Sequence, residues 1–188
     1  MSALPRHPSV TLSADSAAEP FALRVLRLAD LPAVMAIERR VYAQPWSDGN
    51  FIDSLAAGYL AMAMWHRKDK TTPPQLCAYF LAMKGVDEMH LLNISVQPEF
   101  QGQGLAQRLL DALVQQCRDQ RCAQLWLEVR QGNERARQVY ARYGFSQVGV
   151  RRAYYPSHQG QREDAVLMSL PIQEAACLPD IEQEGRPS

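Results

Sequence analysis

The feature that most constrains this chain is a glycine turn between a strand pattern and a helix pattern. Residues 89–96 predict a strand, which Gln97-Pro98 ends. After Gly102 and Gly104 an apolar residue recurs every four positions and predicts an amphipathic helix: Leu105, Leu109, Leu113 and Cys117. Glycines let main-chain N–H groups approach an anion closely, and a helix N-terminus adds partial positive charge. The pattern therefore predicts either a diphosphate site or a tight turn without a ligand.

Two other phosphate-binding motifs do not fit these residues. The glycine spacing is not Gly-x-Gly-x-x-Gly, and no second crossover unit follows, so a Rossmann assignment is weaker. A Walker A loop is excluded because no Gly-Lys-Ser/Thr is present.

The remaining patterns place the turn inside an α/β domain. Helices are expected after Asp30, from Ser47 through Leu55, and from Asn133 to about Arg142, with Gly144 as a stop. The order strand, helix, strand across residues 89–129 requires a parallel crossover, so the sheet is mixed. The other expected strands span residues 21–28, 59–65, 76–83, 123–129, 145–152 and 165–170.

Charge and cysteine usage exclude several classes of protein. Twenty Lys and Arg against twenty Asp and Glu leave no basic excess for holding nucleic acid through phosphates. The four cysteines form no Cys-x-x-Cys pair, and no His pair has metal spacing, so we expect reduced core cysteines and no metal. No signal peptide or membrane-length apolar run is visible, so we expect a cytoplasmic protein that does not contact a membrane.

The domain organisation follows from local composition. Residues 1–20 and 173–188 are poor in large apolar side chains and contain several Pro and Ser residues, so both are expected to be flexible tails. Residues 21–172 between them form the predicted single domain.

Three stretches of the domain resemble a known family. Asn93-Ile94-Ser95-Val96 followed by Gln101-x-x-Gly104-x-Ala106 resembles the Q/R-x-x-G-x-G/A signature of the GNAT acetyltransferases. Residues 125–130 with Asn133, Tyr140 and 143–145 resemble the second half of the GNAT fold. Residues 45–47, 151–156 and 162–165 resemble its subgroup of bacterial ribosomal-protein-alanine N-acetyltransferases. The resemblance covers about residues 21–172 and implies a mixed, twisted central sheet of about six to seven strands flanked by four helices.

The resemblance also implies roles for individual residues, with acetyl-CoA as co-substrate. By this transfer Glu128 is the general base and Tyr140 the general acid, while Arg152, Tyr154 and Tyr155 line the acceptor groove. The acceptor it implies is a protein N-terminus, that of a ribosomal protein. The residues implied to bind the cofactor are Ile94, Ser95, Val96, Gln101, Gly102, Gln103, Gly104, Leu105, Ala106, Gln107 and Asn133.

Each role has an ordinary structural alternative. A glutamate at a strand end is most often a solvated or salt-bridged carboxylate, and a helical tyrosine is most often a core aromatic. Two further functions stay open: acetylation of lysine or a small amine, and a non-catalytic CoA-binding module. Ala153 stands where the resembled family tends to carry a polar residue, and residues 157–161 are slightly longer than usual there.

Overall fold

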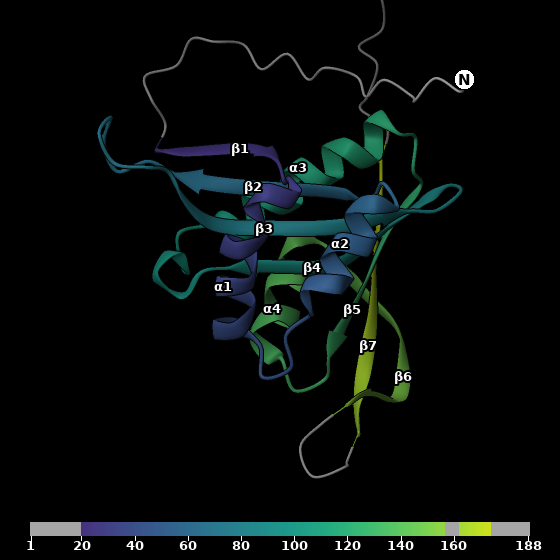
Figure 1. The fold of residues 1–188 in the computed structure, drawn as a ribbon. Helices are drawn as coiled ribbons and strands as arrows, with labels where there is room; N and C mark the ends of the chain where they lie inside the picture. Colours follow the sequence, from purple (N-terminus) through teal and green to yellow (C-terminus); the bar gives the residue numbers. More distant parts are fainter. Residues whose placement is uncertain (1–19, 157–161, 174–188) are drawn as a thin grey trace, which may run out of the picture.

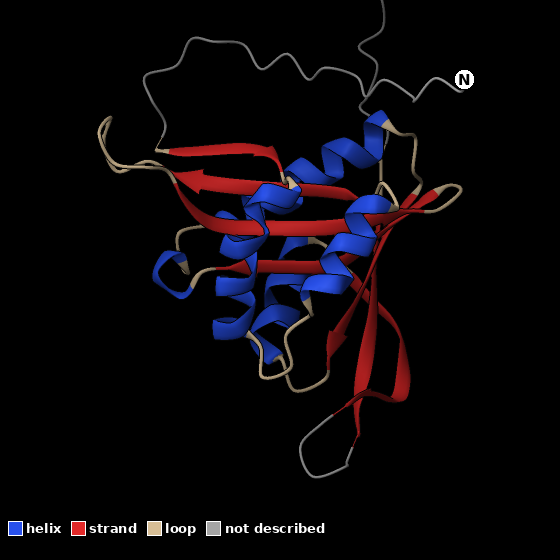
Figure 2. Cartoon of the chain, in the orientation of Figure 1, coloured by secondary structure: helices blue, strands red, loops and turns tan. Residues whose placement is uncertain are grey.

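The computed structural model describes residues 20–156 and 162–173, so nearly all of both expected tails lies outside the described residues. One seven-stranded sheet and four α-helices form the domain (Figures 1 and 2). The strands are β1 (Phe21–Val25), β2 (Leu60–His66), β3 (Gln75–Lys84), β4 (Glu88–Val96), β5 (Gln124–Arg130), β6 (Ser146–Pro156) and β7 (Arg162–Pro171). The helices are α1 (Leu31–Val41), α2 (Asp48–Ala56), α3 (Leu105–Asp119) and α4 (Glu134–Tyr143).

The sheet has the order β1-β2-β3-β4-β5-β7-β6. β4 and β5 pair in parallel and every other neighbouring pair is antiparallel. α3 makes the crossover between the two parallel strands, as the strand and helix patterns predicted. The mixed sheet with four helices confirms the predicted fold.

The helices divide between the two faces of the sheet and bury separate apolar clusters. α1 and α2 lie in front of the sheet in Figure 1, where Val34, Ile37 and Phe51 pack against Tyr79 and Leu81. α3 and α4 lie behind it and cover the second cluster: Leu109, Leu110, Leu113, Leu125, Leu127, Val129 and Tyr140. Because successive strand residues point to opposite faces, β5 places Leu125, Leu127 and Val129 on the α3–α4 face and the intervening residues on the other.

Local capping explains several helix boundaries. Ser47 caps α2, since its Oγ accepts from the Asn50 N–H at 3.2 Å. Asn133 caps α4 in the same way, with its Oδ1 accepting from the Ala136 N–H at 3.1 Å. Gly144 ends α4 with φ of 117°, a left-handed conformation that glycine adopts at little cost.

Three predicted strand boundaries were wrong by three residues or more. The strand expected over residues 21–28 ends at Val25, and a short 3₁₀ turn follows at Leu28–Asp30. The Asp30 carboxylate stabilises that turn by accepting from the Arg27 N–H at 2.9 Å, and makes no side-chain cap of α1. The last two strands are longer than predicted: β6 continues to Pro156 and β7 begins at Arg162.

The expectation for the cysteines is met by the described residues. Cys77, Cys117 and Cys122 are free and buried, as expected of small core residues. Across residues 20–156 and 162–173 we find no helix with the length and apolarity that a membrane crossing requires.

Candidate active site

The sheet splits between its two parallel strands. The β4–β5 ladder runs from the Glu88–Gln124 pair only to the Leu91–Leu127 pair. β4 continues to Val96 along β3, and β5 continues to Arg130 along β7. The two strands therefore diverge at their carboxyl ends and leave a gap in the middle of the sheet.

Main-chain groups of β4 face this gap. Ser95 pairs with Tyr79 of β3, and the Gln97 N–H donates to the Cys77 carbonyl of β3. Because alternate residues of a strand bond to opposite neighbours, the N–H and C=O groups of Ile94 and Val96 point away from β3, toward the gap. Side chains accordingly bond both carbonyls: the Tyr42 hydroxyl donates to Ile94 O at 2.9 Å, and Gln101 Nε2 donates to Val96 O at 3.1 Å. The N–H groups of Ile94 and Val96 point along the same edge and can donate to a ligand in the gap.

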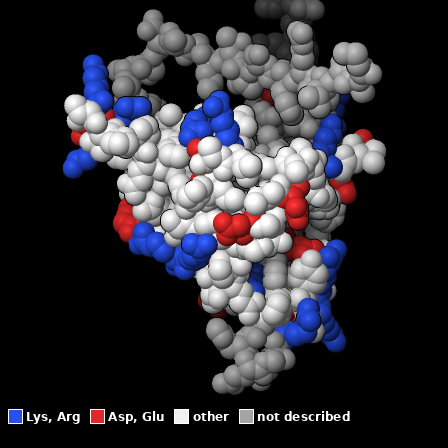
Figure 3. All heavy atoms as spheres, in the orientation of Figure 1, with Lys and Arg blue, Asp and Glu red and all other residues white. Residues whose placement is uncertain are grey.

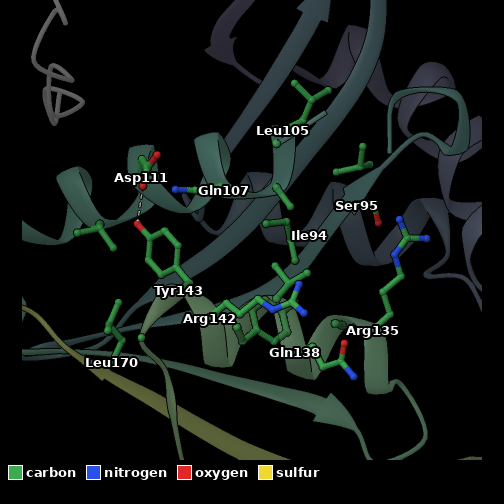
Figure 4. Close-up of a pocket in the computed structure, with 18 of the residues that line it drawn as sticks. Ile94, Ser95, Leu105, Gln107, Asp111, Arg135, Gln138, Arg142, Tyr143 and Leu170 are labelled. Atoms are coloured by element: carbon green, nitrogen blue, oxygen red, sulfur yellow. Dashed lines mark hydrogen bonds between the residues drawn. The ribbon is translucent and has the colours of Figure 1, made fainter. Parts of the chain in front are cut away.

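A cleft of about 1180 Å³ opens from the gap between α3 and α4 (Figure 4). Gly102 and Gly104 line it with φ of 79° and 77°, and no atom lies within 4 Å of a Cβ built on either. The 15-residue helix α3 begins directly after this open turn, so its unpaired N–H groups and dipole favour an anion there. A diphosphate therefore fits these residues.

Arginines supply positive charge around the same cleft. Arg135 donates to Gln101 Oε1 at 2.7 Å, so the Gln101 amide bridges this cation and Val96 of β4. Arg118 and Arg142 also line the cleft. Among the described residues, no group of three His, Cys, Asp or Glu side chains is placed to hold a metal ion.

Ten of the eleven residues predicted to bind the cofactor line the cleft. Gln103 is the exception, and its side chain donates to the Glu99 carbonyl at 3.2 Å. Asn133 lines the cleft while its side-chain oxygen caps α4, so the same residue shapes the wall and starts the helix.

The two predicted catalytic side chains lie on opposite faces of the sheet. Tyr140 lines the cleft on the α3–α4 face and is 9% exposed. Burial is the main cause that raises the pKa of Tyr140, and the nearby Tyr42 and Tyr155 add to it. Glu128 does not line the cleft. It belongs to the β5 residues that point toward the α1–α2 face.

β6 brings three side chains to Glu128. Arg151 Nη1 lies 2.8 Å from Glu128 Oε1, and the Tyr155 hydroxyl donates to the Glu128 carbonyl at 3.3 Å. A hydrogen bond to Glu128 is the main cause that raises the pKa of Tyr154, whose ring meets Tyr155 edge-on at 5.1 Å. Of the predicted acceptor residues, Tyr154 and Tyr155 are thus beside the predicted base, whereas Arg152 is exposed on the strand. Sequence reasoning missed Arg151 as the guanidinium that reaches Glu128.

A buried carboxylate, also missed, connects α1 to this region. Glu38 is fully buried and accepts from Trp46 N at 2.8 Å, from Asn93 Nδ2 at 2.9 Å and from the Tyr79 hydroxyl. These donors compensate the cost of burying a charge and fix the loop before α2 to β3 and β4. The signal was available in the sequence, because Glu38 follows Val34 by four residues on the apolar stripe of α1.

The fold and the cleft define a class of protein: a mixed α/β protein with an anion-binding turn at a split sheet. The family model described as "Acetyltransferase (GNAT) family" matches residues 31–145. The chain belongs to this family and is an acetyl-CoA-dependent N-acetyltransferase.

The similar proteins narrow the subgroup. The ribosomal protein bS18-alanine N-acetyltransferase of Escherichia coli is 39% identical over 147 residues, which are 78% of this chain and 95% of that protein. The enzyme of the same name from Salmonella typhimurium is 37% identical over 150 residues, with 80% and 97% coverage. The crystal structure of the ribosomal-protein-S18-alanine N-acetyltransferase from Escherichia coli has a TM-score of 0.72 at 37% identity, covering 82% of this chain and 96% of that one. These findings confirm the predicted family, subgroup resemblance and co-substrate.

Proposed function

We propose that this enzyme acetylates the N-terminal α-amine of a protein, and that its substrate is the N-terminal alanine of a small-subunit ribosomal protein. The observation that carries the proposal is the near full-length similarity to enzymes named for that activity. An α-amine on a protein N-terminus is the acceptor those names specify. A cytoplasmic location follows from such a substrate.

The split sheet supports direct transfer between two ligands that enter from opposite faces. Acetyl-CoA supplies the acetyl group as a thioester when it is bound along the α3–α4 cleft. The acceptor amine then approaches from the α1–α2 face, where Glu128 lies. The N–H groups of Ile94 and Val96 donate to the thioester oxygen and stabilise the negative charge that develops on it.

Glu128 acts as the general base in this proposal. A protein α-amino group has an ordinary pKa of about 7.7–8.0, so a large part of it is protonated near neutral pH. The Glu128 carboxylate takes a proton from this nitrogen, directly or through one water, so that the nitrogen lone pair forms the new amide bond. No enzyme-bound acetyl group is required.

Tyr140 acts as the general acid. Its buried hydroxyl keeps its proton because burial raises its pKa, and it lines the cleft on the side where the sulfur would lie. Tyr140 gives this proton to the departing thiolate and regains one from water afterwards.

Arg152, Tyr154 and Tyr155 form the outer wall of the acceptor groove in this proposal. An extended N-terminal peptide can be held there by its main chain, and the two rings narrow the entrance. A narrow entrance favours a small first side chain such as alanine, because a larger one would clash.

The net charge of the enzyme supports a protein acceptor that the enzyme binds without itself contacting nucleic acid. The formal charge is zero, and on the face shown in Figure 3 acidic and basic side chains of the described residues are interspersed. Binding that depends mainly on phosphates requires a basic surface.

A peptide panel with isotopic acetyl-CoA tests the proposal. Peptides that begin with Ala should be acetylated at the α-amine faster than the same sequences beginning with Leu, and faster than N-blocked peptides that contain Lys. Mass spectrometry locates the acetyl group. Acetyl on lysine or on a small amine in the preferred substrate would support the alternative acceptor, and no transfer to any amine would leave a CoA-binding module.

A further inference from the structure

β6 contains a large bulge beside Glu128. Arg151 pairs with Ala165 and Tyr155 with Glu163, so β6 advances four residues where β7 advances two. Within the bulge Ala153 has φ of 51°, in the left-handed region. That conformation is strained for a residue other than glycine. Such strain persists only where the surrounding structure stabilises it.

Side chains of β7 stabilise the strained residue. Asp164 Oδ1 accepts from the Ala153 N–H at 2.7 Å. Arg162 donates from Nε to the Ala153 carbonyl at 2.5 Å and from Nη2 to the Tyr154 carbonyl at 2.6 Å. Both main-chain polar groups of Ala153 are therefore bonded by side chains, in place of the ladder bonds that a regular strand would make.

The bulge changes which side chains can reach Glu128. In a regular strand residues 151 and 154 would point to opposite faces, because they are separated by an odd number of positions. Here Arg151 forms an ion pair with Glu128 at 2.8 Å, and the same carboxylate is the main cause that raises the pKa of Tyr154. The Arg151 guanidinium also lies 5.4 Å from the centre of the Tyr154 ring.

We propose that Asp164 is a positioning residue for the acetyl transfer: it fixes the bulge that places Tyr154 beside the Arg151–Glu128 ion pair and thereby holds the Glu128 carboxylate in its working orientation. The inference rests on the proposed role of Glu128 as general base. Asp164 does not line the cleft. Its main-chain carbonyl also accepts from the Gln131 N–H at 3.0 Å, which ties the bulge to the end of β5.

Two substitutions at Asp164 separate this role from simple loss of structure. Asp164→Ala removes the acceptor for the Ala153 N–H, whereas Asp164→Asn retains an oxygen there. A displacement of about 1 Å in a reacting group can cost about 100-fold in rate, so we expect Asp164→Ala to lower kcat for an Ala-initial peptide by about 10- to 100-fold. Asp164→Asn should recover most of this loss. The Kd for acetyl-CoA, measured by calorimetry, should stay within about twofold for both.

Asp69 offers a matched control. Its Oδ1 accepts from the Thr71 and Thr72 N–H groups at 2.9 and 2.7 Å, in the loop between β2 and β3. Asp69→Ala therefore removes a similar bond between a carboxylate and the main chain, at a site that no part of the proposal uses. It should leave kcat and the Kd for acetyl-CoA unchanged.

A double-mutant cycle with Glu128→Gln gives the decisive comparison. If Asp164 and Arg151 act through the base, Asp164→Ala and Arg151→Ala should each slow the wild type but produce no further loss in the Glu128→Gln background. A loss that persists in that background, or a folded Asp164→Ala protein with wild-type kcat, overturns the inference. If Glu128→Gln alone retains wild-type kinetics, the proposed base is wrong, and that outcome is distinct from the other two.

Discussion

The two proposed catalytic residues, Tyr140 and Glu128, lie in different surroundings, and the difference suits an acid and a base. Tyr140 is enclosed by the apolar cluster under α3 and α4, which disfavours the phenolate and keeps a proton available. Glu128 is half-buried among polar partners, with Arg151 Nη1 at 2.8 Å from its Oε1. Environments of opposite character on the two sides of one gap are consistent with opposite roles.

Glu128→Gln should lower kcat by roughly 10²–10⁴, because an amide cannot take the proton of the acceptor amine. The defect should shrink as pH rises from about 7 to 9, since the α-amine loses its proton to solvent over that range. A pH series of kcat/KM with an Ala-initial peptide measures both effects, and calorimetry should find an unchanged Kd for acetyl-CoA. A defect that stays constant across the series would contradict the proton-acceptor role.

Tyr140→Phe should slow turnover by roughly 10²-fold while the domain stays folded. Only a hydroxyl is lost, and the ring keeps its edge-on contact with Phe145 at a centroid distance of 5.8 Å. Departure of the thiolate without a proton donor is the expected reason for the slower reaction. Steady-state kinetics beside a thermal melt tests this, and an unchanged kcat would leave Tyr140 with a packing role alone.

At the scale of elements, the sequence predicted the features that depend on residues adjacent in the chain, namely turns, helix caps and helix ends. The glycine turn before α3, the Ser47 and Asn133 caps and the Gly144 stop all lie where composition placed them. The bulge in β6 could not be predicted in this way, because the side chains that bond its main chain, Asp164 and Arg162, lie on the neighbouring strand.

The same reason explains the site residues that sequence reasoning missed. Arg151 reaches Glu128 across β7, which lies between β5 and β6, so the pairing of the strands and not a local motif brings them together. Glu38 and its donors on β3 and β4 are far apart in the sequence, so no local motif contains them. Tertiary contacts bring them together. The resemblance supplied Glu128 and Tyr140 as candidates, but their placement on opposite faces of the sheet is a property of the fold.

The glycine turn gives a prediction at this scale. With φ of 77°, Gly104 would strain a β-branched side chain, so Gly104→Ala is a better probe of the cleft than Gly104→Val. The added Cβ meets no protein atom and enters the space expected for the diphosphate. Loss of one charge-assisted hydrogen bond, worth about 1.5–3 kcal/mol, should weaken acetyl-CoA binding by roughly 10- to 100-fold.

Gly58→Ala is the control for the turn, because Gly58 has φ of 79° and equally open surroundings at the end of α2. Both substitutions carry the same backbone strain, about 1 kcal/mol. Only Gly104→Ala should change the Kd for acetyl-CoA. Equal Kd values for the two variants would exclude the turn from the cofactor site.

At the scale of the whole molecule, the domain consists of two parts of one sheet joined at a short parallel ladder. β1 to β4 pair continuously on one side, and β5, β7 and β6 on the other, while only four residue pairs connect β4 to β5. A ligand in the cleft contacts both parts at once, since the lining comes from β4 and α3 as well as from α4 and the end of β7. Cofactor binding should therefore stabilise the fold as a unit.

Acetyl-CoA should raise the melting temperature of the whole domain in a single transition. At a free concentration of 100 times Kd, binding to the native state alone contributes about 2.7 kcal/mol. A chain of this size shifts by about 2–4 °C per kcal/mol, so the expected increase is roughly 5–10 °C. Differential scanning calorimetry with increasing ligand measures this increase.

Gly104→Ala should reduce the shift in melting temperature at the same ligand concentration, and Gly58→Ala should retain it. A wild-type melt that separates into two transitions, with only one responding to acetyl-CoA, would show that the ligand does not join the two parts of the sheet.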